Sequence, residues 1–216
     1  MGNIFRLDSP LMKFMMLVTN LICLNILWLI CCVPVITAGA ATTAMYYVIF
    51  QYITKQDDAV LKPFFRSFKE NFRSVTPIWI LNLLIGLAFV AEFFYMSQGA
   101  ETWLKVAFGI LLLIYGGASS YLYPLMARYD TPVKNALRNS FTLSTRYLFS
   151  TLCVVALNAV PAILAVAAPQ IFWKLIMVWL LGGFSLIAYI NGRILLQIFK
   201  KHEPPTEEEL EPSDAE

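Results

Sequence analysis

Three asparagines are the groups in this 216-residue chain best placed to act within apolar surroundings. Each follows a leucine inside a long apolar run, 9–12 residues after a basic residue. At about 1.5 Å per helical residue, this spacing places three neutral amides at a similar depth. An amide can hydrogen bond to a neighbouring helix or line a polar path. For Asn25, Asn82 and Asn158 the pattern favours hydrogen bonds to neighbouring helices, and a polar path lined by these amides stays open.

Small residues gather in the apolar run that follows each asparagine. Small side chains let helix backbones approach closely, so these segments are expected to pack against the asparagine-bearing helices. The pattern therefore predicts three helical hairpins, each of which pairs an amide with small residues. The small residues are Ala38, Gly39, Ala40 and Ala41 in the first hairpin, Gly116, Gly117, Ala118, Ser119 and Ser120 in the second, and Gly182 and Gly183 in the third.

Several kinds of catalytic and metal site are excluded by what the sequence lacks. The one histidine, His202, follows the last apolar run, so His-based metal clusters and Ser-His or Cys-His triads are not expected. No phosphate-binding loop of the G-x-x-x-x-G-K-[ST] type occurs. No charged residue lies deep within an apolar run, which weighs against an ion-coupled pump. We therefore expect no enzyme activity, no catalytic residue, no metal and no cofactor.

The composition is that of a membrane protein. Apolar residues make up 59% of the chain and charged residues 14%, whereas soluble domains have roughly 45–50% and about 25%. This balance excludes a disordered chain, a disulfide scaffold and a nucleic-acid-binding protein. A helix needs about 20 apolar residues to cross a bilayer. We predict an all-α, polytopic bundle of six transmembrane helices in a single domain (residues 1–201), with spans at residues 14–33, 38–54, 75–97, 104–127, 148–168 and 171–193.

The basic residues indicate how the six runs are oriented. If all six cross the membrane, 14 of the 16 Lys and Arg residues fall on one side, and Lys105 and Lys174 fall on the other. The positive-inside rule then predicts a multi-pass protein of the cell membrane with both termini in the cytoplasm. Residues 38–54 form the shortest run, so a re-entrant or interfacial helix is an alternative to a full crossing there.

Two segments on the expected cytoplasmic side have amphipathic helical patterns. Residues 61–73 and 131–147 each place an apolar stripe beside a basic one, as in a helix on an anionic leaflet. Membrane anchoring and docking of a partner subunit are both compatible with this pattern. Residues 202–216 are rich in acids and proline, which predicts a disordered cytoplasmic tail. The stripes are Leu61, Phe65, Phe68 and Phe72 beside Arg66 and Lys69, and Val133, Ala136, Leu137 and Phe141 beside Lys134 and Arg138.

Four stretches in the first third of the chain carry a family resemblance. They are NIFRLDSP (residues 3–10), NLICLNILW (20–28), PVITAGAATTAMYY (34–47) and FRSFKENF (65–72). In these stretches the chain resembles the YesL-like bacterial membrane proteins, domain-of-unknown-function family 624. The residue types within them predict local structural roles. We expect Asp8 to cap the first helix after a turn at Pro10, Pro34 to end the first span, Thr37 to cap the second, and Gly39 to allow a tight turn or close contact.

The resemblance implies an auxiliary role in carbohydrate uptake. Members of this family have no established molecular activity and are commonly encoded beside carbohydrate ABC-importer components in Gram-positive bacteria. We therefore expect an accessory or scaffolding subunit of a carbohydrate (oligosaccharide) ABC import system, with the lipid bilayer and ABC permease or ATPase subunits as partners. A self-sufficient small-molecule membrane transporter is the alternative, and a homo-oligomer stays open.

Overall fold

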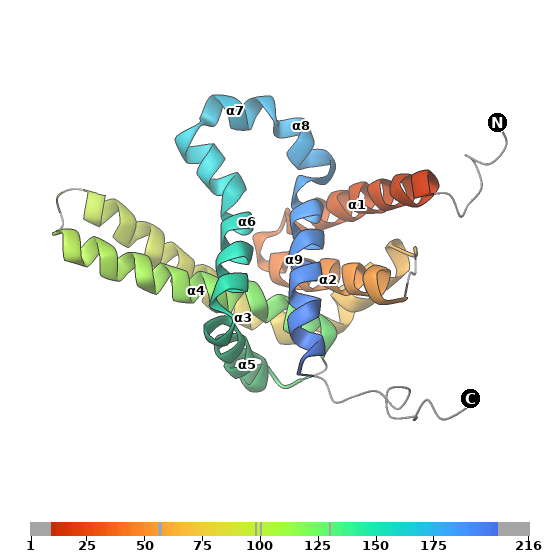
Figure 1. Cartoon of the computed structure of the whole chain (residues 1–216), viewed down its shortest axis with the longest axis horizontal. Helices are drawn as coiled ribbons and strands as arrows, with labels where there is room; N and C mark the ends of the chain where they lie inside the picture. Colours follow the sequence, from red (N-terminus) through yellow and green to blue (C-terminus); the bar gives the residue numbers. More distant parts are fainter. Residues whose placement is uncertain (1–9, 56–57, 98, 100, 130, 203–216) are drawn as a thin grey trace, which may run out of the picture.

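The computed structural model describes residues 10–55, 58–97, 99, 101–129 and 131–202, and every regular element in these ranges is a helix (Figure 1). The all-α prediction is therefore confirmed for this part of the chain. Asp8 and residues 203–216 of the predicted tail lie outside the described residues. The elements are α1 (Pro10–Cys32), the 3₁₀ helix η1 (Val35–Thr37), α2 (Ala38–Lys55), α3 (Leu61–Ser97), α4 (Thr102–Arg128), α5 (Val133–Arg146), α6 (Leu148–Ala167), α7 (Pro169–Lys174), α8 (Ile176–Val178), the π-helical turn η2 (Trp179–Gly183) and α9 (Phe184–Lys200).

Five helical stretches of the described chain are long and apolar enough to cross a membrane. They support the prediction of a multi-pass membrane protein, with five such stretches rather than six. α2 is not among them, although it coincides with the predicted span at residues 38–54. The five stretches are Leu11–Cys32, Leu61–Met96, Thr102–Arg128, Leu148–Ala167 and Ile176–Lys200.

α2 lies at the centre of the bundle, where other helices cover it. Ten of its 18 residues are buried. A Cβ atom on Gly39 would lie 2.5 Å from Cβ of Trp79 on α3, and one on Gly192 of α9 would lie 2.9 Å from Cγ2 of Ile49 on α2. In Figure 1 the α3–α4 hairpin extends to the left of this centre, the α6–α9 hairpin upward and α1 to the right. Because protein rather than lipid surrounds α2, the helix tolerates more polar residues than one exposed to lipid.

No break in the helix separates the predicted amphipathic segment (residues 61–73) from the predicted span (residues 75–97). Both belong to the single helix α3, whose 37 residues extend about 55 Å. The change from basic to apolar side chains alters the surroundings that the helix prefers, but it leaves the backbone hydrogen bonds intact. No glycine and no proline lies at the boundary, and Pro77 is accommodated within the helix.

The buried faces of the two amphipathic segments also differ from the predicted stripes. In the first half of α3, Phe64 and Ser67 are buried, whereas Leu61, Phe65 and Phe72 are exposed. Phe68 is half-buried against the core. α5 buries a face of small and mid-sized side chains and exposes two large apolar ones. The buried residues of α5 are Ala136, Ser140, Leu143 and Ser144, and its exposed large apolar residues are Leu137 and Phe141.

The last predicted span, residues 171–193, does not form one continuous helix. Its first residues form the short helix α7, which begins at Pro169. Leu175, with φ −92° and ψ 6°, separates α7 from α8, and the membrane-compatible stretch runs from Ile176 to Lys200. The ring of Pro169 removes a backbone donor and favours a new helix start, which accounts for the beginning of α7. Lys174, the last residue of α7, directly precedes the break at Leu175.

The close α2–α3 contact can be tested with Gly39→Ala. The added methyl group would collide with the Trp79 side chain, and the resulting overpacking should cost about 1–3 kcal/mol of unfolding free energy. Gly109→Ala on α4 is the matched control, since a Cβ atom there would meet no atom of the described residues within 4 Å. Thermal unfolding in detergent, followed by circular dichroism, should show a lower Tm only for Gly39→Ala. Equal Tm values for the two variants would contradict the packing described.

Candidate functional site

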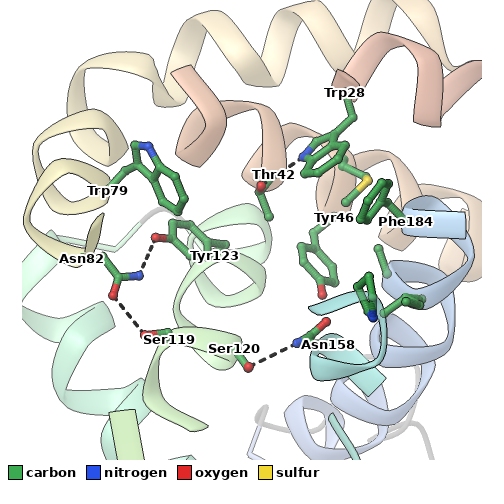
Figure 2. A pocket seen from close by; sticks show the side chains of 14 residues that line it. Trp28, Thr42, Tyr46, Trp79, Asn82, Ser119, Ser120, Tyr123, Asn158 and Phe184 are labelled. Carbon is green, nitrogen blue, oxygen red and sulfur yellow. Dashed lines mark hydrogen bonds between the residues drawn. The ribbon is translucent and has the colours of Figure 1, made fainter. Parts of the chain in front are cut away.

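An uncharged, open cavity of about 290 Å³ lies where the three helical hairpins meet (Figure 2). It receives side chains from α1, α2, α3, α4, α6 and α9. Among the described residues that line it, none is Asp, Glu, Lys, Arg or His. Its polar groups are amides and hydroxyls, and its flat walls are aromatic rings. Two of the three asparagines singled out in the sequence, Asn82 and Asn158, therefore contribute to one site.

The Asn82 amide forms the wall of the cavity between α3 and α4. Its Nδ2 donates a hydrogen bond to the Tyr123 hydroxyl at 2.8 Å, and its Oδ1 accepts one from the Ser119 hydroxyl at 3.1 Å. The Tyr115 hydroxyl donates to the backbone carbonyl of Asn82 at 2.7 Å. The α3–α4 pairing thus fixes the orientation of this amide from both of its ends.

The Asn158 amide occupies the other side of the cavity in Figure 2 and joins α6 to α4 and α9. Its Nδ2 donates to the Ser120 hydroxyl at 3.2 Å, and its Oδ1 accepts a hydrogen bond from Nδ2 of Asn191 at 2.9 Å. Asn191 is fully buried on α9. The sequence analysis missed Asn191, which lies inside the last predicted span but follows Ile190 rather than a leucine.

Aromatic side chains complete the cavity walls. The Trp28 indole N–H donates to the Thr42 hydroxyl at 3.1 Å, and the Trp28 and Phe184 rings lie 5.1 Å apart. The Trp79 indole N–H donates to a backbone carbonyl at 2.6 Å, and its ring meets Tyr123 at a centroid distance of 6.0 Å. Because their own polar atoms are bonded within the protein, both indoles present their faces rather than their N–H groups.

Asn25 does not line the cavity. It is fully buried and bonds to the π-helical turn η2, where the backbone departs from the regular α-helical pattern. Its Nδ2 donates to the carbonyls of Trp179 at 3.0 Å and Leu180 at 2.9 Å, and its Oδ1 accepts the backbone N–H of Ser185 at 2.9 Å. The Ser185 hydroxyl in turn donates to the Leu21 carbonyl at 2.8 Å. These bonds join α1 to the start of α9.

The glycines singled out in the sequence lie at helix contacts. A Cβ atom on Gly117 would lie 2.8 Å from Cγ2 of Thr151 on α6, and one on Gly116 would lie 3.6 Å from Val155. Gly182 and Gly183 belong to η2, where a Cβ atom on Gly183 would lie 2.5 Å from the Trp179 ring. All four are absent from the cavity lining.

The motif residues near the first turn have mainly local contacts. Pro10 begins α1, and Pro34 lies just beyond its end. The Thr37 hydroxyl donates to the carbonyls of Cys31 and of Pro34, the latter at 2.6 Å. Its hydrogen bonds therefore run back towards the end of α1 rather than to the first amides of α2. Within the described ranges, no group of three or more His, Cys, Asp or Glu residues could hold a metal ion.

The basic candidates lie on the outer sides of α3 and α5. Lys69, Lys134 and Arg138 are exposed, and Arg66 forms an exposed ion pair with Glu70 at 3.0 Å. A second cavity, of about 540 Å³, lies between the first half of α3 and the end of α4 and includes both members of this pair. These residues are separate from the uncharged cavity.

Comparisons with known proteins give a family similarity and no activity. Residues 21–93 match the family model described as "Protein of unknown function, DUF624". The chain is similar to the uncharacterized protein YesL of Bacillus subtilis (strain 168), with 25% identity over 210 residues, 95% of this chain and 97% of YesL. It is 27% identical to the uncharacterized protein YteU of the same organism over 187 residues, 83% of this chain and 80% of YteU. No solved structure matches the chain.

The different surroundings of the asparagines predict different costs of substitution. Asn25→Leu would leave three buried backbone groups without their partner, so it should lower the unfolding free energy by about 2 kcal/mol or more. Asn158→Leu, at an exposed position on the open cavity, should cost about 0.6–1.7 kcal/mol, the range for polar contacts between membrane helices. Denaturant titration of the purified variants in mixed micelles measures both values. A larger loss for Asn158→Leu would contradict the assigned surroundings.

Proposed function

The chain belongs to the YesL-like DUF624 family, and from this premise we propose that it is an integral membrane accessory or scaffolding subunit of a carbohydrate (oligosaccharide) ABC import system. It would carry out no chemistry of its own and would contact permease or ATPase subunits. The carbohydrate part of this proposal rests on the family resemblance. The observation that carries the accessory role is the set of large apolar side chains exposed on α3 and α5.

α3 and α5 expose large aromatic rings beside their basic residues, although each helix also buries apolar side chains such as Phe64 and Leu143. The first half of α3 buries Ser67 while Phe65 and Phe72 are 51% and 37% exposed. α5 buries Ser140 while Phe141 is 52% exposed. Exposing such rings to water is unfavourable by roughly 1.5–3 kcal/mol for each ring, so these helices gain stability from an apolar partner. A neighbouring permease subunit would supply such a surface, and the nearby Lys and Arg residues would favour an acidic segment on it.

A self-sufficient small-molecule membrane transporter is the second candidate function. The uncharged cavity supports it, because solute sites in carriers lie between helices at the meeting point of repeated units. The described residues that line the cavity include no acid or base that could couple movement to a proton or ion gradient. This favours the accessory role over the transporter.

We further propose that both termini lie on the cytoplasmic side of the cell membrane. The support is the segregation of 14 of the 16 basic residues. In this topology the loops around Gly99 and Lys174 are external. It also requires α2 to cross the membrane fully, with the turn between α1 and α2 outside, because a re-entrant α2 would place the N-terminus on the external side.

The accessory role predicts co-purification with importer subunits. Affinity purification of the full chain from native membranes in mild detergent, followed by mass spectrometry, should recover ABC permease or ATPase subunits. Phe65→Ser and Phe72→Ser should each reduce this recovery by about ten-fold, since a lost aromatic contact is worth roughly 1.5–3 kcal/mol. Phe93→Ser, at an exposed position near the far end of α3, is the matched control and should leave recovery unchanged. Uptake of a sugar into liposomes by the purified chain alone would contradict the accessory role and favour the transporter.

The topology predicts the accessibility of single introduced cysteines. Residues Gly99 and Lys174, changed to cysteine in a cysteine-free background, should react with a membrane-impermeant maleimide in intact cells. Arg146→Cys and Lys200→Cys should react only after the membrane is permeabilised. External labelling at Lys200 would refute the cytoplasmic C-terminus. Val35→Cys should be labelled from outside, and its protection in intact cells would indicate a re-entrant α2 and refute the cytoplasmic N-terminus.

A further inference from the structure

We infer that the uncharged cavity between Asn82 and Asn158 binds a small, neutral, polyhydroxylated molecule of the size of a monosaccharide. This inference goes beyond the accessory role, because it assigns a ligand to the membrane domain itself rather than to its partners. It rests on three independent properties of the cavity: the charge of its lining, its remaining hydrogen-bonding capacity, and the shape and size of its walls.

The charge of the lining selects a neutral ligand. The described lining residues include no carboxylate, amine, guanidinium or imidazole group. A charged ligand would therefore lose its hydration without gaining an opposite charge, which is strongly unfavourable in apolar surroundings. A neutral polar ligand avoids this cost if its hydrogen bonds are replaced.

The two amides can replace those hydrogen bonds from opposite walls. A primary amide has two N–H donors and an oxygen with two lone pairs. The hydrogen bonds found within the described structure use one side-chain donor and one lone pair of Asn82, and the same number for Asn158. Each amide therefore retains one donor and one acceptor. A hydroxyl group both donates and accepts, so a ligand with hydroxyls on two sides can bond to both amides.

The aromatic walls select a ligand that also has an apolar face. The rings of Trp28 and Phe184 lie on one side of the cavity, and those of Trp79 and Tyr123 lie on the other (Figure 2). A pyranose ring offers C–H groups on its faces and hydroxyls around its rim, which matches flat rings beside amides. The volume of about 290 Å³ is near the lower end of the range for small-molecule pockets, so it suits one sugar ring rather than an oligosaccharide. A free sugar and the headgroup of a glycolipid share this chemistry.

Binding can be measured on the purified full chain in nanodiscs of phosphatidylethanolamine and phosphatidylglycerol, prepared without sugar-based detergents. Equilibrium dialysis would use radiolabelled D-glucose, D-galactose and D-xylose as neutral probes, and D-glucuronate and D-glucosamine as charged ones. Octyl β-D-glucoside below its micellar concentration represents the glycolipid headgroup. We expect saturable binding of at least one neutral probe, and binding of the charged sugars at least about ten-fold weaker. Binding of the octyl glucoside but not of the free sugars would assign the ligand to a lipid headgroup.

Two pairs of variants separate a ligand site from nonspecific adsorption. Asn158→Leu should weaken binding by about ten-fold or more, whereas Asn135→Leu on the exposed side of α5 should not change it. Trp28→Phe should weaken binding, and Trp173→Phe, at an exposed position, is its control. The unfolding transition of each variant establishes that it is folded.

Three results would overturn the inference. They are the absence of saturable binding for every neutral sugar and for octyl glucoside, equal binding of glucose and glucuronate, and binding by folded Asn158→Leu equal to that of the unmodified chain. None of these results would affect the accessory role, which is measured by the recovery of partner subunits. Conversely, loss of partner recovery in Phe65→Ser leaves the cavity and its binding unchanged.

Discussion

Polar groups within an apolar bundle must find partners inside the protein, and the bonds of Asn25 meet this requirement at the least regular point of the chain. The π-helical turn Trp179–Gly183 departs from the α-helical pattern near the start of the membrane-compatible stretch Ile176–Lys200. Lipid cannot hydrogen bond to the backbone groups involved, so a side chain has to do so. Asn25 bonds to two carbonyls and one N–H there, and Ser185 returns a bond to α1. These hydrogen bonds between α1, η2 and Ser185 fix where α9 begins and how it is rotated about its axis.

The rotation of α9 has consequences for the cavity. It directs Asn191 towards Asn158, and Phe184 towards Trp28. Gly39 on α2 allows α3 to approach this central helix closely, and Gly192 on α9 allows α9 to do so. The hairpins therefore meet tightly at α2 and leave an uncharged space beside it. The same close packing that stabilises the bundle also positions the amides and rings of the proposed ligand site.

The outer sides of α3 and α5 present aromatic side chains to the surroundings of the bundle. Small polar side chains such as Ser67 and Ser140 face the protein, while Phe65 and Phe141 face outward. Serines allow these helices to lie close to the core, and the outward rings are available to a partner or to lipid. The chain thus has two separate features with functional meaning: an internal cavity suited to a neutral ligand, and outward aromatic residues suited to a protein partner.

The sequence by itself determined the helical content and the multi-pass membrane character. Both follow from the number of consecutive apolar residues, which is a local property. It also identified the three asparagines, because a lone amide in an apolar run stands out. Only the tertiary structure decided that Asn82 and Asn158 line one cavity, that Asn25 stabilises a π-turn, and that Asn191 and Trp28 belong to the same region. It also decided the break near Leu175 and the buried face of α3. The physical reason is that lipid-facing and protein-facing sides of a membrane helix are both apolar, so hydrophobic periodicity carries little information about helix rotation. That rotation depends on contacts between residues far apart in the chain.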